Sequence, residues 1–133
     1  MNIAIIGTGH VGLVTGACLA DLGNQVVCVD NDRAKIAALK KGIIPFYEPG
    51  LAELVTANKR EKRLLFTTSI QRAVQASEII FIAVGTPPRT NGEANLMYVE
   101  QVSRQIAKHM TSYRLIVEKS TVPVETGWGV YNT

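Results

Sequence analysis

The sequence contains little cysteine, few aromatic side chains and no long hydrophobic run. Its two cysteines, Cys18 and Cys28, are too few for a disulfide scaffold and match no metal or redox spacing. We therefore expect both to be small, buried core residues in a reducing compartment, and we expect no metal site. Because no apolar stretch reaches the roughly 20 residues of a membrane-spanning helix, we expect no membrane partner.

We also expect no targeting leader, since the apolar residues 3–6 follow the start directly, without a basic segment or a small-residue cleavage site. This predicts a cytoplasmic protein. Positive charge is modest, with a net charge of +3, and its clearest cluster is Lys59, Arg60, Lys62 and Arg63. Glu61 interrupts this cluster and no aromatic residue is interleaved. We therefore interpret it as a solvated helix end and expect no nucleic-acid partner.

What is present fits one globular domain, residues 1–133, because 47% of the 133 residues are hydrophobic and 19% are charged. Four apolar runs rich in β-branched residues predict strands at Ile3–Ile6, Val26–Val29, Ile79–Val84 and Leu115–Val117. A weaker apolar run, Leu64–Phe66, predicts a fifth. The runs do not alternate apolar with polar residues, so the strands should be covered on both faces. The sequence therefore predicts an α/β fold, a Rossmann-like doubly wound parallel sheet.

Helical patterns separate these strands. Helices are expected to begin at Gly12, after Asp32, at Pro49, after Ser69 and after the N-cap residue Asn95. The first helix should pack through Val11, Val14, Cys18 and Leu22, and the last through Leu96, Val99, Val102 and Ile106. The irregular segments 42–48 and 85–93 should lie at one end of the sheet, where ligands bind in such folds.

A glycine-rich turn follows the first predicted strand. Gly7, Gly9 and Gly12 form the pattern G-x-G-x-x-G, in which the first glycine permits the turn and the second lets a pyrophosphate approach the backbone. The third lets helix and strand pack closely, and the helix N-terminus faces the phosphates. A kinase loop would lead into a strand and a V-A-I-K lysine, and a triphosphatase loop would carry Gly-Lys-Ser/Thr. Neither is present, so the pattern predicts a dinucleotide site.

Asp30 ends the second predicted strand, where an acidic residue can accept hydrogen bonds from the adenosine ribose diol. Its charge would repel the 2′-phosphate of NADP, which predicts NAD as the cofactor. The alternative is that Asp30 only caps the next helix, a role for which Asp32 is better placed. Lys35, one helical turn further on, either reaches the same ribose or is solvated.

Polar residues also follow the last two predicted strands. Gly85 and Thr86 can line the cofactor cleft, or they form an ordinary proline turn. Ser120 and Thr121 can hydrogen-bond a nicotinamide, a ribose or a water, or they cap a helix before a proline.

Five ordered motifs extend over the chain: GTGxVGLVTGACLA from Gly7, CVD from Cys28, GIIPFYEPGL from Gly42, FIAVGTPP from Phe81 and KSTVPV from Lys119. Together they resemble the N-terminal domain of the UDP-glucose/GDP-mannose dehydrogenase family, and residues 47–51 and 85–88 resemble its UDP-glucose branch. The resemblance implies an NAD-dependent UDP-glucose 6-dehydrogenase. Such enzymes oxidise the sugar 6-hydroxyl to a carboxylate in two hydride transfers, through a thiohemiacetal on a cysteine.

By this resemblance, the NAD contacts would be Val11, Asp30, Lys35, Thr86 and Thr121. Thr121 would also lie near the reacting centre as an auxiliary group. The nucleophilic cysteine and the UDP-sugar pocket would lie beyond residue 133, so we expect the chain alone to be inactive and to bind a UDP-sugar only with that missing part. Two residues depart from the family, His10 for its common tyrosine and Glu125 for its frequent glycine. His10 fits a packing replacement better than a ligand to phosphate or substrate.

Five strands are one fewer than the complete fold has, which predicts a fragment whose fifth strand is an open edge and promotes self-association. Two other functions fit the same residues. One is a non-catalytic module that senses NAD, and the other is the NAD domain of a related GDP-mannose or UDP-N-acetylhexosamine dehydrogenase. A sensor needs the glycine turn and Asp30 but has no use for residues 47–51 or 120–123, which favour the enzyme.

Overall fold

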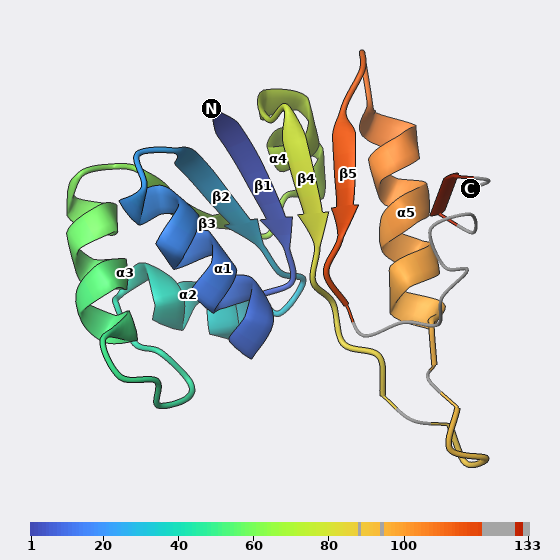
Figure 1. The fold of residues 1–133 in the computed structure, drawn as a ribbon, viewed down its shortest axis with the longest axis horizontal. Helices are drawn as coiled ribbons and strands as arrows, with labels where there is room; N and C mark the ends of the chain where they lie inside the picture. Colours follow the sequence, from blue (N-terminus) through green and yellow to red (C-terminus); the bar gives the residue numbers. More distant parts are fainter. Residues whose placement is uncertain (88, 94, 121–129, 132–133) are drawn as a thin grey trace.

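A parallel sheet with the strand order β3-β2-β1-β4-β5 forms the centre of the molecule (Figure 1). The computed structural model describes residues 1–87, 89–93, 95–120 and 130–131. The strands are β1 (Asn2–Ile6), β2 (Gln25–Val29), β3 (Leu64–Thr67), β4 (Ile79–Ile82) and β5 (Leu115–Glu118). The predicted α/β class and the parallel arrangement of all five strands are confirmed. β4 is shorter than predicted, because Ala83 and Val84 already belong to the following loop.

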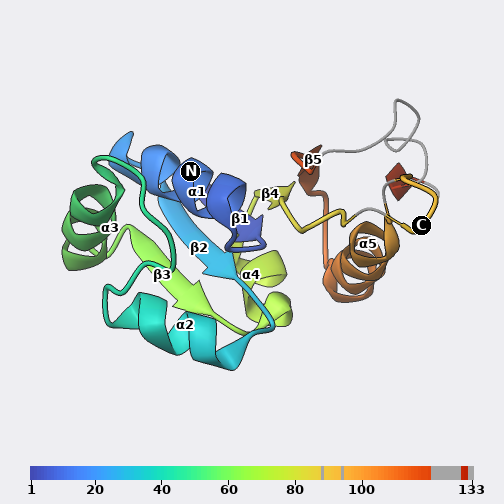
Figure 2. The same cartoon turned by 90° about the horizontal axis from the view of Figure 1, so that it is seen from below.

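Helices cover both faces of this sheet. They are α1 (His10–Asp21), α2 (Arg33–Lys40), α3 (Leu51–Arg60), α4 (Ile70–Ala76) and α5 (Met97–His109). Figure 2 shows α1 and α3 on one side of the sheet and α4 and α5 on the other. Two apolar clusters correspond to these layers, one under α1 and α3 and one under α4 and α5. Burial on both faces explains why the strand sequences are continuously apolar.

Two predicted helix starts are confirmed by their caps. The Asp32 carboxylate accepts a hydrogen bond from the Lys35 amide at 3.1 Å, and the Ser69 hydroxyl accepts one from the Arg72 amide at 3.2 Å. Each satisfies a backbone donor that the first helical turn leaves without a partner. At α5, the Asn95 side chain accepts from the Met97 amide at 3.0 Å, although the N-cap position itself is Leu96.

The other two predicted starts were wrong by two residues. α1 begins at His10 rather than Gly12, because Gly9 is the last extended residue and occupies the N-cap. α3 begins at Leu51 rather than Pro49, because Gly50 adopts a left-handed turn with φ of 82° before the helix. Glycine takes that conformation without the steric cost that a side chain would add.

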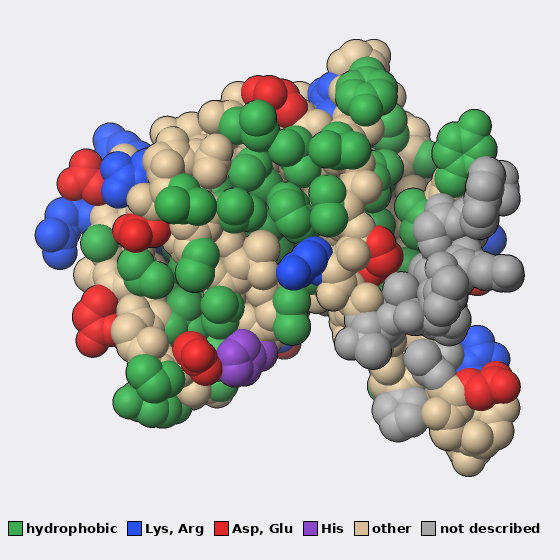
Figure 3. Space-filling model, viewed as in Figure 1, with side chains coloured by type: hydrophobic (Ala, Val, Ile, Leu, Met, Phe, Trp, Pro, Cys, Tyr) green, Lys and Arg blue, Asp and Glu red, His purple; other side chains and the backbone are tan. Residues whose placement is uncertain are grey.

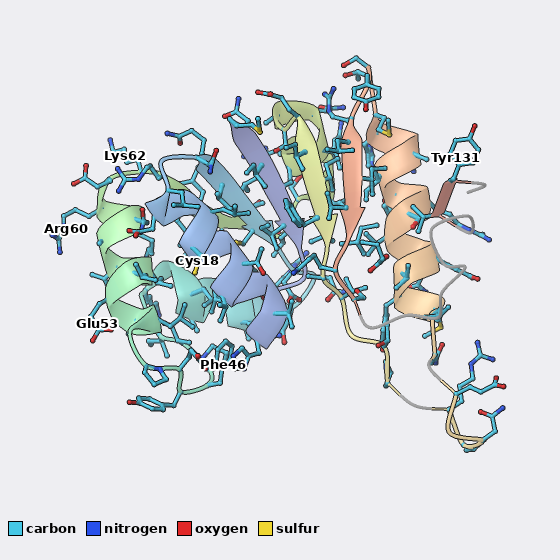
Figure 4. The ribbon with its side chains drawn as sticks, in the orientation of Figure 1. Cys18, Phe46, Glu53, Arg60, Lys62 and Tyr131 are labelled. Atoms are coloured by element: carbon cyan, nitrogen blue, oxygen red, sulfur yellow. The ribbon has the colours of Figure 1, made fainter. Side chains whose placement is uncertain are left out.

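The packing face of α1 also differs from the prediction. Its buried residues are Gly12, Leu13, Gly16, Ala17 and Ala20. By contrast, Val11 is 51% and Leu22 79% exposed, and Val14 is only partly buried. Cys18, labelled in Figure 4, is also exposed. The small residues face the sheet because the helix approaches it closely: a Cβ on Gly16 would lie 2.8 Å from the Cys28 Sγ. Cys28 is fully buried as expected, whereas the prediction of a buried Cys18 was wrong.

The basic cluster is partly structural. The Arg63 guanidinium donates to the Ala20 carbonyl at 3.2 Å and to the Asn58 side chain at 3.0 Å, and Lys59 donates to the Lys40 carbonyl. Figure 4 shows Arg60 and Lys62 pointing away from the sheet. Among the described residues, none of the helices combines the length and apolar character that crossing a bilayer requires.

Candidate functional site: a dinucleotide cavity at the strand ends

A cavity of about 1060 Å³ opens at the carboxyl ends of β1, β2 and β4. This is the point where the strand order reverses, and ligands bind there in open α/β sheets. Of the eight residues predicted to bind the cofactor, those that line it are Gly7, Gly9, Val11, Asp30, Lys35 and Thr86; Gly12 does not, and Thr121 lies outside the described residues. The structure therefore brings together side chains from three separate loops. The predicted site segment 42–48 is not among the described residues that line the cavity.

Each glycine of the turn has a distinct steric role. Gly7 has φ of 108°, and a Cβ there would lie 2.5 Å from the Ala83 carbonyl oxygen. A Cβ on Gly12 would lie 1.9 Å from the Gly7 carbonyl oxygen, so this position holds the turn against the helix. A Cβ on Gly9 would meet no atom within 4 Å. Packing of the fold therefore does not require glycine at this position. The missing side chain instead leaves room beside the N-terminus of α1, where a phosphate group can bind.

Asp30 is fixed by the neighbouring strand end. Its Oδ2 accepts hydrogen bonds from the Thr8 hydroxyl at 2.7 Å and from the Thr8 amide at 3.1 Å. Its Oδ1 accepts from the Asp32 amide at 3.0 Å, and the Lys35 Nζ lies 3.6 Å from Oδ2. Asp32 caps α2, so capping does not explain Asp30.

These contacts determine the charge of Asp30. Burial raises its pKa, but the hydrogen bonds from Thr8 and Asp32 and the charge of Lys35 lower it, and the resulting pKa lies below its usual value. The carboxylate is therefore ionised at neutral pH and accepts hydrogen bonds. Its side chain is 14% exposed, so it can still meet a ligand in the cavity. Lys35 is paired with Asp30 rather than simply solvated.

The segments after β4 and β5 meet at the other end of the cavity. Gly85 and Thr86 line it together with Lys119 and Ser120. The Ser120 hydroxyl donates to the Val84 carbonyl at 2.8 Å, which joins the two loops. Thr121 and Glu125, both singled out by the sequence, lie outside the described residues.

His10 connects the glycine turn to the loop before α3. Its ring stacks on Phe46, with ring centroids 4.8 Å apart and an angle of 12° between the planes, and its Nε2 lies 3.2 Å from a Glu48 carboxylate oxygen. Figure 4 shows Phe46 below the first turn of α1. The stack fits the packing interpretation of His10, although His10 also lines the cavity.

The sequence did not predict that α5 forms one wall of the cavity. Tyr98, Gln101 and Gln105 line the cavity from this helix. Their spacing of three and then four residues places them on one helix face, next to the buried face of Val99 and Ile106. That spacing was visible in the sequence, but nothing in it showed that this face borders the dinucleotide cavity.

Known proteins share this architecture. A UDP-glucose 6-dehydrogenase of Bacillus subtilis, TuaD, is 57% identical over 126 residues, which are 95% of this chain and 27% of that protein. A UDP-glucose 6-dehydrogenase of Rhizobium meliloti is 54% identical over 96% of the chain and 29% of its own length. The solved structure of a GDP-mannose dehydrogenase from Pseudomonas aeruginosa superposes with a TM-score of 0.93 at 39% identity, over 98% of this chain and 30% of that one.

The strand order, glycine turn and cavity define a dinucleotide-binding domain of the Rossmann type. The chain belongs to the UDP-glucose/GDP-mannose dehydrogenase family, whose NAD-binding domain its residues 1–133 match. It spans less than a third of the length of the curated relatives named above.

Proposed function

We propose that this chain is the NAD-binding domain of an enzyme that oxidises UDP-glucose at its 6-hydroxyl, and that residues 1–133 form one domain. The proposal is supported by one observation. The backbone of Gly9, which no side chain covers, the N-terminus of α1 and the ionised Asp30 all border a single cavity. Bound NAD would supply the hydride acceptor. The free thiols of Cys18 and Cys28 fit a reducing compartment such as the cytoplasm.

Each site residue has a role in this proposal. The turn formed by Gly7, Gly9 and Gly12, together with Val11, would hold the pyrophosphate. Asp30 accepts hydrogen bonds from the adenosine ribose, and Lys35 holds the carboxylate and reaches the same ribose. The remaining contacts come from the resemblance to the family, and they are Thr86 and Thr121.

Sequence similarity supports UDP-glucose over other sugar nucleotides. The two curated relatives named UDP-glucose 6-dehydrogenase are 57% and 54% identical to this chain. The motif at residues 47–51, which a cofactor sensor would not need, supports an enzyme in the same way.

The test is the choice between NAD and NADP, measured by calorimetry. A 2′-phosphate about 4 Å from the Asp30 carboxylate costs up to about 4 kcal/mol at an effective dielectric of about 20, or roughly a thousandfold in affinity. Lys35, 3.6 Å from the same carboxylate, reduces this figure. We therefore expect a strong preference for NAD, and we expect Asp30→Ala to remove most of it.

Asp32→Asn is the matched control. It removes a negative charge two residues away, on an exposed side chain, and asparagine still accepts the hydrogen bond that caps α2. The NAD preference should survive this change. Equal affinity for the two cofactors in the unmodified chain, or equal losses in the two variants, would contradict the role of Asp30.

We further propose that the chain by itself does not oxidise UDP-glucose. Cys18 is exposed on α1, Cys28 is buried in β2, and neither borders the cavity, so neither thiol is held against a substrate there. Incubation with UDP-glucose and NAD should give no NADH above a protein-free control. Steady NADH formation that Cys18→Ser abolishes would overturn this proposal.

The outer edge of β5 is a candidate for self-association, as the sequence predicts. Among the described residues, β5 pairs with β4 on one side only. An unpaired strand edge can template pairing with another chain. The amides of Leu115 and Lys119 donate to the β4 side, so the alternating amide of Ile116 faces the open edge. Sedimentation should therefore detect concentration-dependent association, and replacing Ile116 by proline should reduce it. A chain that stays monomeric at high concentration would contradict this proposal.

A further inference from the structure

The two oxygens of the Asp30 carboxylate accept different numbers of hydrogen bonds. Oδ2 accepts from both the hydroxyl and the amide of Thr8, at 2.7 and 3.1 Å, and also faces the Lys35 ammonium at 3.6 Å. Oδ1 accepts only from the Asp32 amide, at 3.0 Å, among the described residues. A carboxylate oxygen accepts about two hydrogen bonds. The acceptor position that remains for a ligand is therefore on Oδ1.

Thr8 can hydrogen-bond Asp30 because the strand register brings the two residues together. Ile6 of β1 lies opposite Val29 of β2, and the Gly7 amide donates to the Val29 carbonyl at 2.7 Å. Thr8 and Asp30 therefore follow paired strand ends, although 22 positions separate them in the sequence. Thr8 is fully buried, so no water competes for its hydroxyl proton.

We propose that Thr8 is a positioning residue for cofactor selection: it holds Oδ2 of Asp30 so that Oδ1 is the oxygen presented to the ribose diol. This inference rests on the proposed binding of the adenosine ribose by Asp30. The hydroxyl of Thr8 donates to Asp30, so Thr8 acts through the orientation and charge of that carboxylate. A serine would keep the same donor, whereas an isosteric valine would remove it.

Two consequences follow for binding. A carboxylate held in one orientation meets the diol without first losing rotational freedom, so NAD gains affinity. The hydroxyl of Thr8 also donates to the ionised carboxylate and favours that form, which is the form that repels a 2′-phosphate. Loss of the hydroxyl should therefore weaken NAD binding and the discrimination against NADP together.

The experiment compares Thr8→Val with Thr8→Ser by calorimetry with NAD and NADP. We expect Thr8→Val to lower the ratio of NAD affinity to NADP affinity about tenfold, and Thr8→Ser to keep it within about twofold of the unmodified chain. Circular dichroism checks the fold of each variant. If Thr8→Val does not fold, Thr8→Ala provides the same comparison. A folded valine or alanine variant with the original ratio would overturn the proposal.

A second measurement needs no cofactor. Carboxyl NMR of Asp30 during an acid titration should show a higher pKa in Thr8→Val than in the unmodified chain, with Thr8→Ser close to the latter. Buried packing alone would not produce that pattern. If Asp30→Ala lowers the NAD preference but Thr8→Val leaves both it and the titration unchanged, only the role of Thr8 fails. If Asp30→Ala leaves the preference intact, the proposed ribose contact fails as well.

Discussion

One methyl group placed at two glycines of the same turn should produce opposite results. In Gly12→Ala, the new Cβ would lie 1.9 Å from the Gly7 carbonyl oxygen, a backbone atom that no side-chain rotation can move away. Overpacking of this kind costs about 1–3 kcal/mol or more, and the higher helix propensity of alanine returns about 1 kcal/mol. We expect Gly12→Ala to lower the free energy of unfolding by about 2 kcal/mol.

Gly9→Ala should leave the fold nearly unchanged. The new Cβ would meet nothing within 4 Å, and φ of −73° is accessible to any residue. Alanine caps a helix less well than glycine, but it also reduces the entropy of the unfolded chain. The two effects are each below about 1 kcal/mol and opposite in sign, so stability should stay within about 0.5 kcal/mol.

NAD affinity should depend more on Gly9 than on Gly12, the reverse of their order in stability. Gly9 borders the cavity at the N-terminus of α1, so a side chain there keeps the pyrophosphate from the backbone amides. We expect Gly9→Ala to weaken NAD binding and Gly9→Val to abolish it in calorimetry, while urea unfolding followed by circular dichroism gives the stabilities. Unchanged NAD affinity in Gly9→Val would show that the turn is only structural. Unchanged stability in Gly12→Ala would refute the close-approach argument.

Three further predictions follow from other sites. Burial raises the pKa of Glu118 above its usual value despite the hydrogen bond from the Ser120 amide, so ionisation of Glu118 destabilises the fold as pH rises through that pKa. Glu118→Gln should therefore be the more stable chain at pH 7 in urea unfolding, with a difference that shrinks as pH falls through the raised pKa and is gone below about 4.3, the usual pKa of a glutamate. A difference independent of pH would contradict this. Burial raises the pKa of the Cys28 thiol to about 12. A thiol reagent at pH 8 should therefore label only the exposed Cys18 until the chain unfolds. Rapid labelling of both cysteines in the folded chain would contradict this. His10→Ala removes the stack on the loop before α3, and hydrogen exchange there should speed up while exchange in β1 does not; equal rates in both chains would mean that the stack does not hold the loop.

Local sequence signals were enough to predict most of the framework. Continuous β-branched runs identify strands buried on both faces, and Asp32 and Ser69 mark helix starts because their side chains bond the first amides directly. Gly7 and Gly12 were assigned correctly because their roles depend on contacts within the turn and the adjoining strands. These features depend on short stretches of chain, which a single sequence displays.

Features that depend on distant packing were missed. Two stripes on α1 have helical spacing, and only the close approach to the sheet decides that the small residues, not Val11 and Leu22, face inward. The hydrogen bond from Thr8 to Asp30 depends on the register of β1 against β2. The contact of His10 with Phe46 requires the conformation of a loop that no local pattern fixes.

The central position of β1 sets the order in which the sheet can be completed during synthesis. Ile3 lies between Val26 on one side and Ile79 on the other, so the second pairing closes roughly three times as much chain as the first and costs about 1 kcal/mol more in loop entropy. β1, β2 and β3 are available to pair once residue 67 has been made, but the backbone N–H and C=O groups on one edge of β1 stay unpaired until β4 is made. At about 5–20 residues per second this wait lasts about 1–3 seconds, during which the exposed edge can pair with another nascent chain.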